Sequence, residues 1–257
     1  MKYLLLFFLG LIISCSEDEA PKLDCRLTKI TVTGKNSIAQ TTYTYNSSGK
    51  IDRQVRTING TTIFDYRYSY NSAGKVDRVD FGDSYTQFEY TTDGKIANQI
   101  GYSNTGTING KFIYVWSGNN VEIKYTQPAK PNPIQSTTLE FLNDNLIKRS
   151  FKSFTGNEPN VLLILHETYY EDFDTALSEF YVANPARPGF TAEISKNNPR
   201  KQIDISISYT GGVITQESTS TTILSYTYNA SNAVVTSKAT TNGTDVIDTM
   251  ITYDQCD

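Results

Sequence analysis

The sequence has few histidines and cysteines, two residue types that often build catalytic and metal sites. Its 257 residues include one histidine, His166, and three cysteines, and no G-x-S-x-G, H-E-x-x-H, P-loop or C-x-x-C motif occurs. A single histidine cannot form a multi-histidine metal site, and the neighbouring Glu167 would point to the opposite face of a strand. We therefore expect a structural His166, no metal ion, no cofactor and no enzymatic activity.

The chain also lacks an excess of basic charge and any run long enough to span a membrane as a helix. With 23 Lys and Arg against 27 Asp and Glu, its formal net charge is −4, so we expect no nucleic-acid partner, which would need a basic surface. The apolar residues 4–13 are too few for a spanning helix, which needs about 20. With the basic start before them, they are typical of a secretory signal peptide.

A cysteine follows this apolar run directly. The letters IISC at 12–15 resemble a bacterial lipobox, which implies cleavage before Cys15 and a lipid on that residue. An ordinary signal peptide is the alternative. The next four residues resemble the acidic tag that sends lipoproteins of the Bacteroidota to the cell surface, and a solvated acidic tether is the alternative: Ser16, Glu17, Asp18 and Glu19.

These resemblances imply an outer-membrane lipoprotein, held by its N-terminal lipid and exposed at the cell surface or, alternatively, facing the periplasm. The chain then divides into a signal peptide (1–14), a flexible tether (15–23) and one folded domain (24–257). With Cys15 lipidated, Cys25 and Cys256 remain, one at each end of the folded part. A disulfide between them is expected in an oxidising compartment, and two unpaired thiols are the alternative.

The folded part repeats one hairpin unit. TTYTYNSSGKIDRQV (41–55), YRYSYNSAGKVDRVD (66–80) and QFEYTTDGKIANQI (87–100) are clear copies, and fainter ones follow at 112–125, 139–151 and 224–237. Each unit reads strand, Gly-containing turn, strand. Further hairpin turns are predicted between units, at Asn59-Gly60, Asn109-Gly110, Gly211-Gly212 and Asn242-Gly243.

Alternation within the strands predicts one covered face. Tyr66, Tyr68 and Tyr70 share a face with Phe64, whereas polar residues occupy most of the other. Together with the single tryptophan, Trp116, these tyrosines form a candidate ligand face for a glycan or a protein. Packing against neighbouring aromatics is the alternative, and we favour it.

The pattern Y-x-Y-(N/D)-x-x-G-(K/R)-(I/V) resembles the YD repeat of RHS and teneurin shells, over most of residues 38–155 and again near 222. The resemblance implies an all-β fold in which antiparallel hairpins stack sideways into an extended, curled sheet. The stretch SKNNP (195–199) and the terminal YDQC (253–256) are similar to segments of uncharacterised YD-repeat-like lipoproteins of the Bacteroidota. That group implies no activity.

Residues 169–200 interrupt the repeats. Phe173, Ala176, Leu177 and Phe180 fall at helical spacing, which predicts one short helix over 173–182 with Asp172 as its cap. Asp172 and Asp174 belong to an acidic segment that fits a solvated helix start; paired carboxylates of a hydrolase are the less favoured interpretation.

Two short motifs are similar to the Asp-(Ser/Thr)-apolar sites at which Bacteroidota O-glycosylate exported proteins, with Thr175 and Thr249 as acceptors. Taken together, the sequence predicts a lipid-anchored envelope protein that serves as a surface binding or interaction module for a glycan or a protein. A structural subunit of an envelope complex is the alternative, and a hydrolase using Asp172 and Asp174 is the less favoured one.

Overall fold

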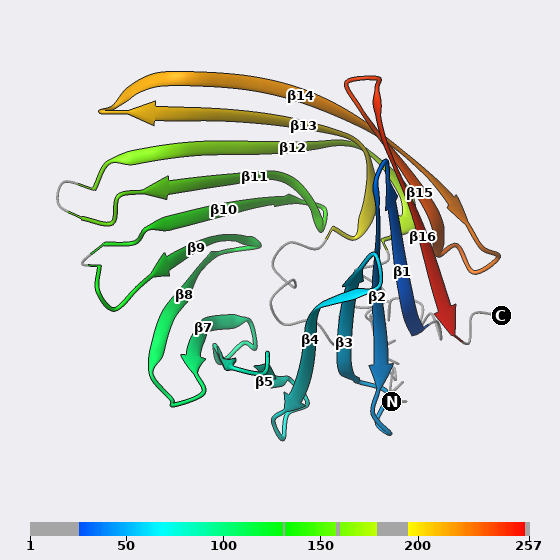
Figure 1. The fold of residues 1–257 in the computed structure, drawn as a ribbon, viewed down its shortest axis with the longest axis horizontal. Helices are drawn as coiled ribbons and strands as arrows, with labels where there is room; N and C mark the ends of the chain where they lie inside the picture. Colours follow the sequence, from blue (N-terminus) through cyan, green and yellow to red (C-terminus); the bar gives the residue numbers. More distant parts are fainter. Residues whose placement is uncertain (1–25, 131, 158–159, 179–194, 255–257) are drawn as a thin grey trace, which may run out of the picture.

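The structure, a computed structural model, describes residues 26–130, 132–157, 160–178 and 195–254. These residues form sixteen antiparallel strands that follow one another around the molecule (Figure 1). The first eight are β1 (Arg26–Gly34), β2 (Ser37–Tyr45), β3 (Ile51–Ile58), β4 (Thr61–Tyr70), β5 (Val76–Asp80), β6 (Ser84–Tyr90), β7 (Ile96–Ser103) and β8 (Ile108–Ser117). The others are β9 (Asn120–Thr126), β10 (Gln135–Leu142), β11 (Asn145–Phe154), β12 (Leu162–Leu177), β13 (Asn197–Thr210), β14 (Val213–Tyr228), β15 (Val234–Thr241) and β16 (Asp245–Asp254).

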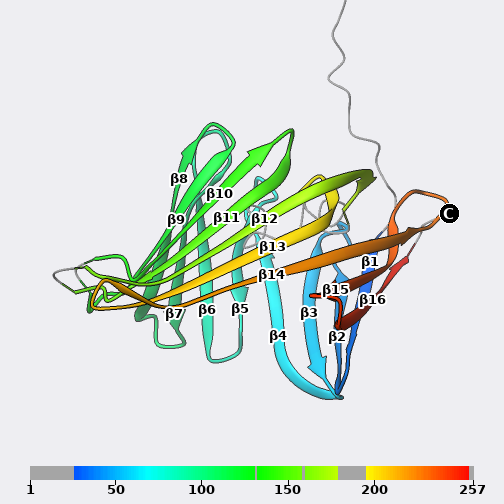
Figure 2. The same ribbon diagram turned by 90° about the horizontal axis from the view of Figure 1, so that it is seen from above.

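The sheet closes into a barrel, which corrects the expectation of an extended, curled sheet. β1 pairs with β16 along its length, from Arg26 opposite Asp254 to Thr33 opposite Asp248. Figures 1 and 2 both show these two strands side by side. Closure removes the two unpaired edges that an open sheet would expose. Hairpin turns decide only which strand lies next to which, so the local pattern predicts the hairpins correctly but not the closure.

The turns of the repeats gather at one end of the barrel, which we call the first end. β1 also begins there, at Arg26. In the first repeat, Asn46 Oδ1 accepts hydrogen bonds from the backbone N–H groups of Ser48 (2.9 Å) and Lys50 (3.0 Å). Gly49 adopts φ 75°, a conformation that L residues with a side chain disfavour. The hairpins are thus formed by local turn chemistry, as predicted.

The opposite, second end carries the turns between repeats. The predicted turns at 59–60, 211–212 and 242–243 are confirmed, with positive φ at both residues of each. The turn predicted at Asn109-Gly110 is wrong, because both residues lie in β8 and the chain reverses around Gly106 instead. Gly110 serves close packing: an added Cβ there would lie 2.6 Å from Cε2 of Tyr125.

The tyrosine-bearing face points into the barrel. The largest fully buried apolar side chains lie on this face by strand register, with exposed fractions of 0–1 %: Leu27, Ile51, Val121, Leu139 and Val234. Only the inward side of a closed single-layer sheet can be shielded so completely by the protein itself. Alternation therefore predicted the covered face correctly.

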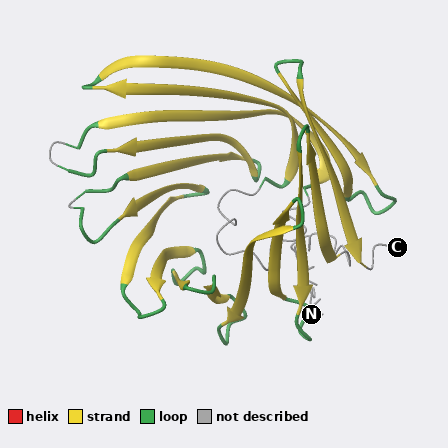
Figure 3. Cartoon of the chain, viewed as in Figure 1, coloured by secondary structure: helices red, strands yellow, loops and turns green. Residues whose placement is uncertain are grey.

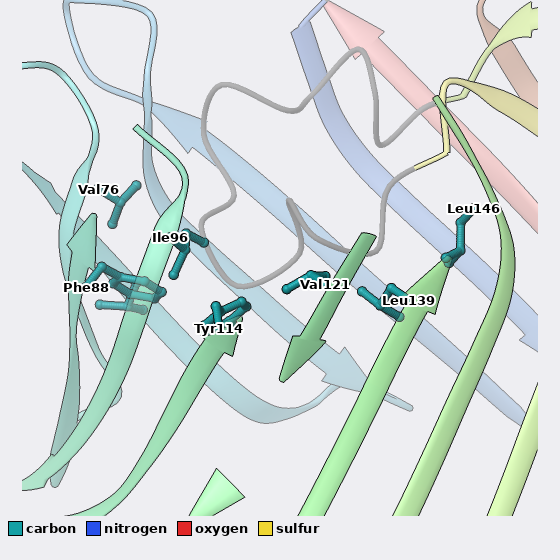
Figure 4. Close-up of a cluster of buried hydrophobic side chains, with 8 residues drawn as sticks. Val76, Phe88, Ile96, Tyr114, Val121, Leu139 and Leu146 are labelled. Atoms are coloured by element: carbon teal, nitrogen blue, oxygen red, sulfur yellow. The ribbon is translucent and has the colours of Figure 1, made fainter. Parts of the chain in front are cut away.

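The core is a belt near the first end. Seven consecutive strands, β5 to β11, each contribute a buried side chain: Val76, Phe88, Ile96, Tyr114, Val121, Leu139 and Leu146 (Figure 4). A second cluster continues the belt through β1, β2, β3, β15 and β16. The barrel is thus held by an apolar ring rather than by a central layer between two sheets.

Adjacent hairpins are joined by a repeated contact, which we call the hairpin clamp. The Tyr70 hydroxyl at the end of β4 donates to the Ile51 carbonyl at the start of β3 (2.7 Å). Lys50 Nζ lies 5.0 Å from the Tyr70 ring centroid and donates to the Gly74 carbonyl of the next turn (2.9 Å). Equivalent aromatic–carbonyl bonds with a cation near the ring occur at Tyr45–Leu27 with Arg26, Tyr90–Val76 with Lys75, and Trp116–Ile96 with Lys95.

The helix expected over 173–182 is wrong for residues 173–177, which belong to β12, and 179–182 lie outside the described residues. Phe173 pairs with Pro199 and Leu177 with Asn197, so the intervening residues form a bulge. Asp172 has φ 54° immediately before it. The bulge, not a helical turn, produces the apolar spacing. The described residues contain no helix (Figure 3), and therefore none long and apolar enough to cross a membrane.

The clamp generates a stability prediction. Tyr70→Phe removes the hydroxyl that satisfies the Ile51 carbonyl, and we expect the free energy of unfolding to fall by about 1 kcal/mol. Tyr85→Phe is the matched control, because the Tyr85 hydroxyl makes no hydrogen bond to the described residues, and its effect should stay within about 0.5 kcal/mol. Urea unfolding of both variants measures the difference. Equal losses would show that the clamp hydrogen bond contributes nothing specific.

The clamp tyrosines also predict a loss of stability at high pH. Burial raises the pKa of Tyr45 to about 12, partly offset by Arg26, and burial raises the pKa of Tyr90 to about 12. An unfolded tyrosine titrates near pH 10, so this stability is complete below about pH 10 and is lost as the pH rises towards 12. The urea midpoint should fall over that interval, and Tyr45→Phe should make the fall shallower. An unchanged slope in the variant would contradict the assignment.

Candidate functional site

The predicted ligand-face aromatics lie on the inward face, and three of them have their polar atoms engaged within the protein. Tyr70 and Trp116 belong to hairpin clamps, and the Tyr68 hydroxyl donates to Gln54 Oε1 (2.7 Å). Burial raises the pKa of Tyr68 well above its usual range. Tyr66 stacks on Phe64 with ring centroids 4.2 Å apart. Their contacts are those of packing side chains, and a ligand role for them stays a prediction.

The acidic segment is tied to neighbouring strands by hydrogen bonds. Asp174 accepts from the backbone N–H of Asn198 (3.2 Å), from its side-chain amide (3.3 Å) and from the Tyr228 hydroxyl. Asp172 is exposed, and the adjacent Glu171 pairs with Lys201 (2.8 Å). Within the described ranges, no three His, Cys, Asp or Glu side chains gather where they could hold a metal ion. Asp174 thus links β12, β13 and β14.

The SKNNP stretch fastens the start of β13 to its neighbours. The Ser195 hydroxyl accepts from the Leu146 N–H (2.9 Å), and Asn145 Oδ1 accepts from the Asn197 N–H (2.7 Å). Asn198 is 2 % exposed, and its amide contacts Asp174. The Pro199 carbonyl accepts from the Tyr226 hydroxyl (2.8 Å). The motif singled out in the sequence is therefore a structural junction of β11, β12, β13 and β14.

His166 belongs to an inward-facing polar cluster on β12 and β13. Its Nε2 lies 3.4 Å from Asp204 Oδ1, which also accepts from the Thr168 hydroxyl (2.8 Å). Gln202 donates to Asp204 Oδ2 (2.8 Å). Sequence reasoning missed Asp204 as a partner, because the contact depends on the register between two strands joined by a long connection.

The two predicted O-glycosylation residues differ in placement. Thr175 is exposed in the β12 bulge, whereas Thr249 lies within β16, paired with Ser237 on one side and Val32 on the other. Cys15, the tag residues 16–19, Cys25 and Cys256 lie outside the described residues. Lipidation, export and the disulfide therefore stay predictions.

Described residues line two hollows on the barrel wall. One, of about 540 Å³, extends over β14, β15, β16 and β1, and is lined mainly by threonine and serine side chains with Met250. The other, of about 380 Å³, lies at the second end between the β5–β6 and β7–β8 turns. We call it the turn hollow; its lining is Arg78, Asp80, Gly82, Ser84, Tyr85, Asn104, Thr105 and Gly106.

An aromatic and charged stack borders the turn hollow. The Arg78 guanidinium lies 3.6 Å from the Tyr85 ring centroid, and Tyr85 stacks on Tyr102 with centroids 4.9 Å apart. Sequence reasoning missed this pair. The sequence did contain a signal for it. Side chains alternate between the two faces of a strand, and Tyr85 is an odd number of residues, five, before the clamp tyrosine Tyr90, so in a regular strand it must face the other way.

Two solved structures share the barrel. A porin-like protein from Bacteroides vulgatus ATCC 8482 superposes with a TM-score of 0.57 and 12 % identity, covering 90 % of this chain and 100 % of that chain. A porin-like protein from Bacteroides uniformis ATCC 8492 gives 0.54 and 12 %, covering 89 % and 96 %. At this identity the likeness shows the fold alone.

No protein-family model matches the sequence, and no curated protein matches it. A match to the TcdB2–TccC3 complex has a TM-score of 0.32 and covers 13 % of that chain, so it carries no argument about the YD-repeat shells. The all-β architecture of antiparallel hairpins is confirmed, and membership of the YD-repeat lipoproteins stays a prediction.

The junction around Asp174 predicts the effect of one substitution. Asn198→Ala leaves a mostly buried carboxylate without its amide donor, and we expect unfolding to become easier by about 1–3 kcal/mol. Asn98→Ala is the control, because the Asn98 amide donates an exposed hydrogen bond to Glu89 on the outward face, and this variant should lose no more than about 0.5 kcal/mol of unfolding free energy. Urea unfolding of the two variants makes the comparison, and equal losses would contradict a structural role for Asn198.

Proposed function

We propose that the protein is a lipid-anchored barrel of the cell envelope that stands in water and binds a glycan or a protein ligand. The observation that carries the proposal is the distribution of charge on the barrel wall. Ion pairs lie on the outward face within the strands: Arg53–Asp65 (2.6 Å), Lys124–Glu122 (3.1 Å) and Lys148–Glu167 (2.8 Å). The inward face carries the apolar belt.

At these three ion pairs the polarity is the reverse of that in a transmembrane barrel. Barrels that cross a bilayer turn an apolar band outward and polar residues inward, and an outward Arg or Lys at the bilayer midplane destabilises them by about 2–4 kcal/mol. Here Arg53, Lys124 and Lys148 face outward on separate strands. The porin-like name of the structural neighbours raises the alternative of a pore, and this charge distribution weighs against it.

Anchoring by Cys15 agrees with the position of β1. A ten-residue tether between Cys15 and Arg26 reaches at most about 35 Å when extended. Because β1 starts at the first end, that end would lie nearest the membrane and the second end would face away from it. The acidic tag at residues 16–19 is the basis for the side of the outer membrane: we propose exposure at the cell surface, with the periplasm as the alternative. We assign the protein a binding role and no catalytic one.

Fractionation of the full chain, expressed with its signal peptide in a bacterial host, tests the proposal. The wild type should stay with the membranes, and Cys15→Ser should appear in the soluble fraction without detergent. Cys25→Ser is the matched control and should stay with the membranes. Neither form should open channels in planar lipid bilayers. A Cys15→Ser protein that needs detergent, or that conducts ions, would contradict the proposal.

A further inference from the structure

The turn hollow differs from the inward aromatics because its polar groups have few internal partners. Both hydrogen bonds from Arg78 to Asp80 go to Oδ1, which leaves Oδ2 without a partner among the described residues. The side chains of Ser84 and Asn104 and the Tyr85 hydroxyl, which also line the hollow, make no hydrogen bonds to the residues that the structure describes. In contrast, Tyr70 has its hydroxyl occupied by a backbone carbonyl.

Contacts within the protein hold the residues that line the hollow in place. Tyr85 lies between the Arg78 guanidinium and the Tyr102 ring. The Asn104 N–H donates to the Asp83 carbonyl, 3.1 Å away, which links the two turns that form the rim. A preformed site of this kind orders few side chains when a ligand binds, so less binding energy is lost.

The charges of the hollow select the class of ligand. Arg78 and Asp80 neutralise each other, so the lining attracts neither an anion nor a cation strongly. A carboxylate oxygen, a primary amide and hydroxyl groups together offer donors and acceptors for neighbouring hydroxyl groups of a ligand. The Tyr85 ring, covered on its faces by Arg78 and Tyr102, adds its apolar edge next to these polar groups. This combination fits a neutral, polyhydroxylated molecule with apolar C–H faces.

The position of the hollow suits an extended ligand from outside the cell. It opens at the second end, opposite the end where β1 begins. If the chain is anchored through Cys15, this end points away from the membrane.

We propose that the turn hollow is a binding site for a neutral oligosaccharide. Asp80 and Asn104 contact its hydroxyl groups, and Tyr85 contributes the hydroxyl and ring edge beside them. This inference deepens the proposed binding function and rests on it.

An array of immobilised neutral and acidic oligosaccharides, probed with the full chain carrying Cys15→Ser, is the first test. We expect binding to at least one neutral oligosaccharide. Titration calorimetry with that oligosaccharide in free form then gives the affinity. Asn104→Ala and Tyr85→Phe should each weaken binding by about fivefold to tenfold, the effect of one lost hydrogen bond.

Asn98→Ala is the matched control, because it removes an amide from the outward face of β7, the strand that ends directly before Asn104, at a position that does not line the hollow. It should bind with wild-type affinity. Circular dichroism of each variant separates lost binding from lost folding. Wild-type affinity in both Asn104→Ala and Tyr85→Phe, a blank array, or binding to acidic oligosaccharides alone would overturn this site. Ion conduction or detergent dependence of Cys15→Ser would instead overturn the proposed function.

Discussion

The contact on which the barrel depends is the clamp between one hairpin and the next. The hydroxyl of Tyr70, at the end of one strand, donates to the carbonyl of Ile51 at the start of the strand before it. Lys50, from the preceding turn, lies over the Tyr70 ring and donates to a carbonyl of the next turn. Each clamp satisfies a backbone acceptor near the first end, next to the apolar belt. Four such clamps follow one another along the wall from β1 to β9, so this part of the barrel is joined hairpin to hairpin without a central core.

The clamp also explains why aromatic residues alone are a poor guide to the binding surface. Tyrosines repeated in the motif have their hydroxyls bonded within the protein, so they build the wall. Tyr85 and Tyr102 lie outside the motif, face outward and stack beside a hollow in which Asp80 Oδ2 and the side chains of Ser84 and Asn104 have no hydrogen-bond partner among the described residues. The satisfaction of the polar atom, rather than the residue type, distinguishes the two groups.

The distribution of charged side chains on the barrel wall bears on whether the barrel spans a membrane. Sixteen strands are enough for a membrane channel, and the porin-like proteins of Bacteroides share the architecture. In this chain the charged pairs Arg53–Asp65 and Lys148–Glu167 occupy the outward face. Charged pairs on the outward face are the observation on which the proposal of a lipid-anchored barrel outside the bilayer rests.

The sequence by itself determined the hairpins, their repeated turns and the covered face. Turns such as the one at Asn46 form through hydrogen bonds between residues close in the chain, and the alternation of side chains along a strand is equally local. It misled at Phe173–Leu177, where a bulge imitates helical spacing, and at Asn109-Gly110, where a glycine serves packing rather than a turn. Only the tertiary structure decided the closure of β1 on β16, the partnership of His166 with Asp204 and the turn hollow. These depend on twist and register accumulated over many strands, and no short window of residues contains that information.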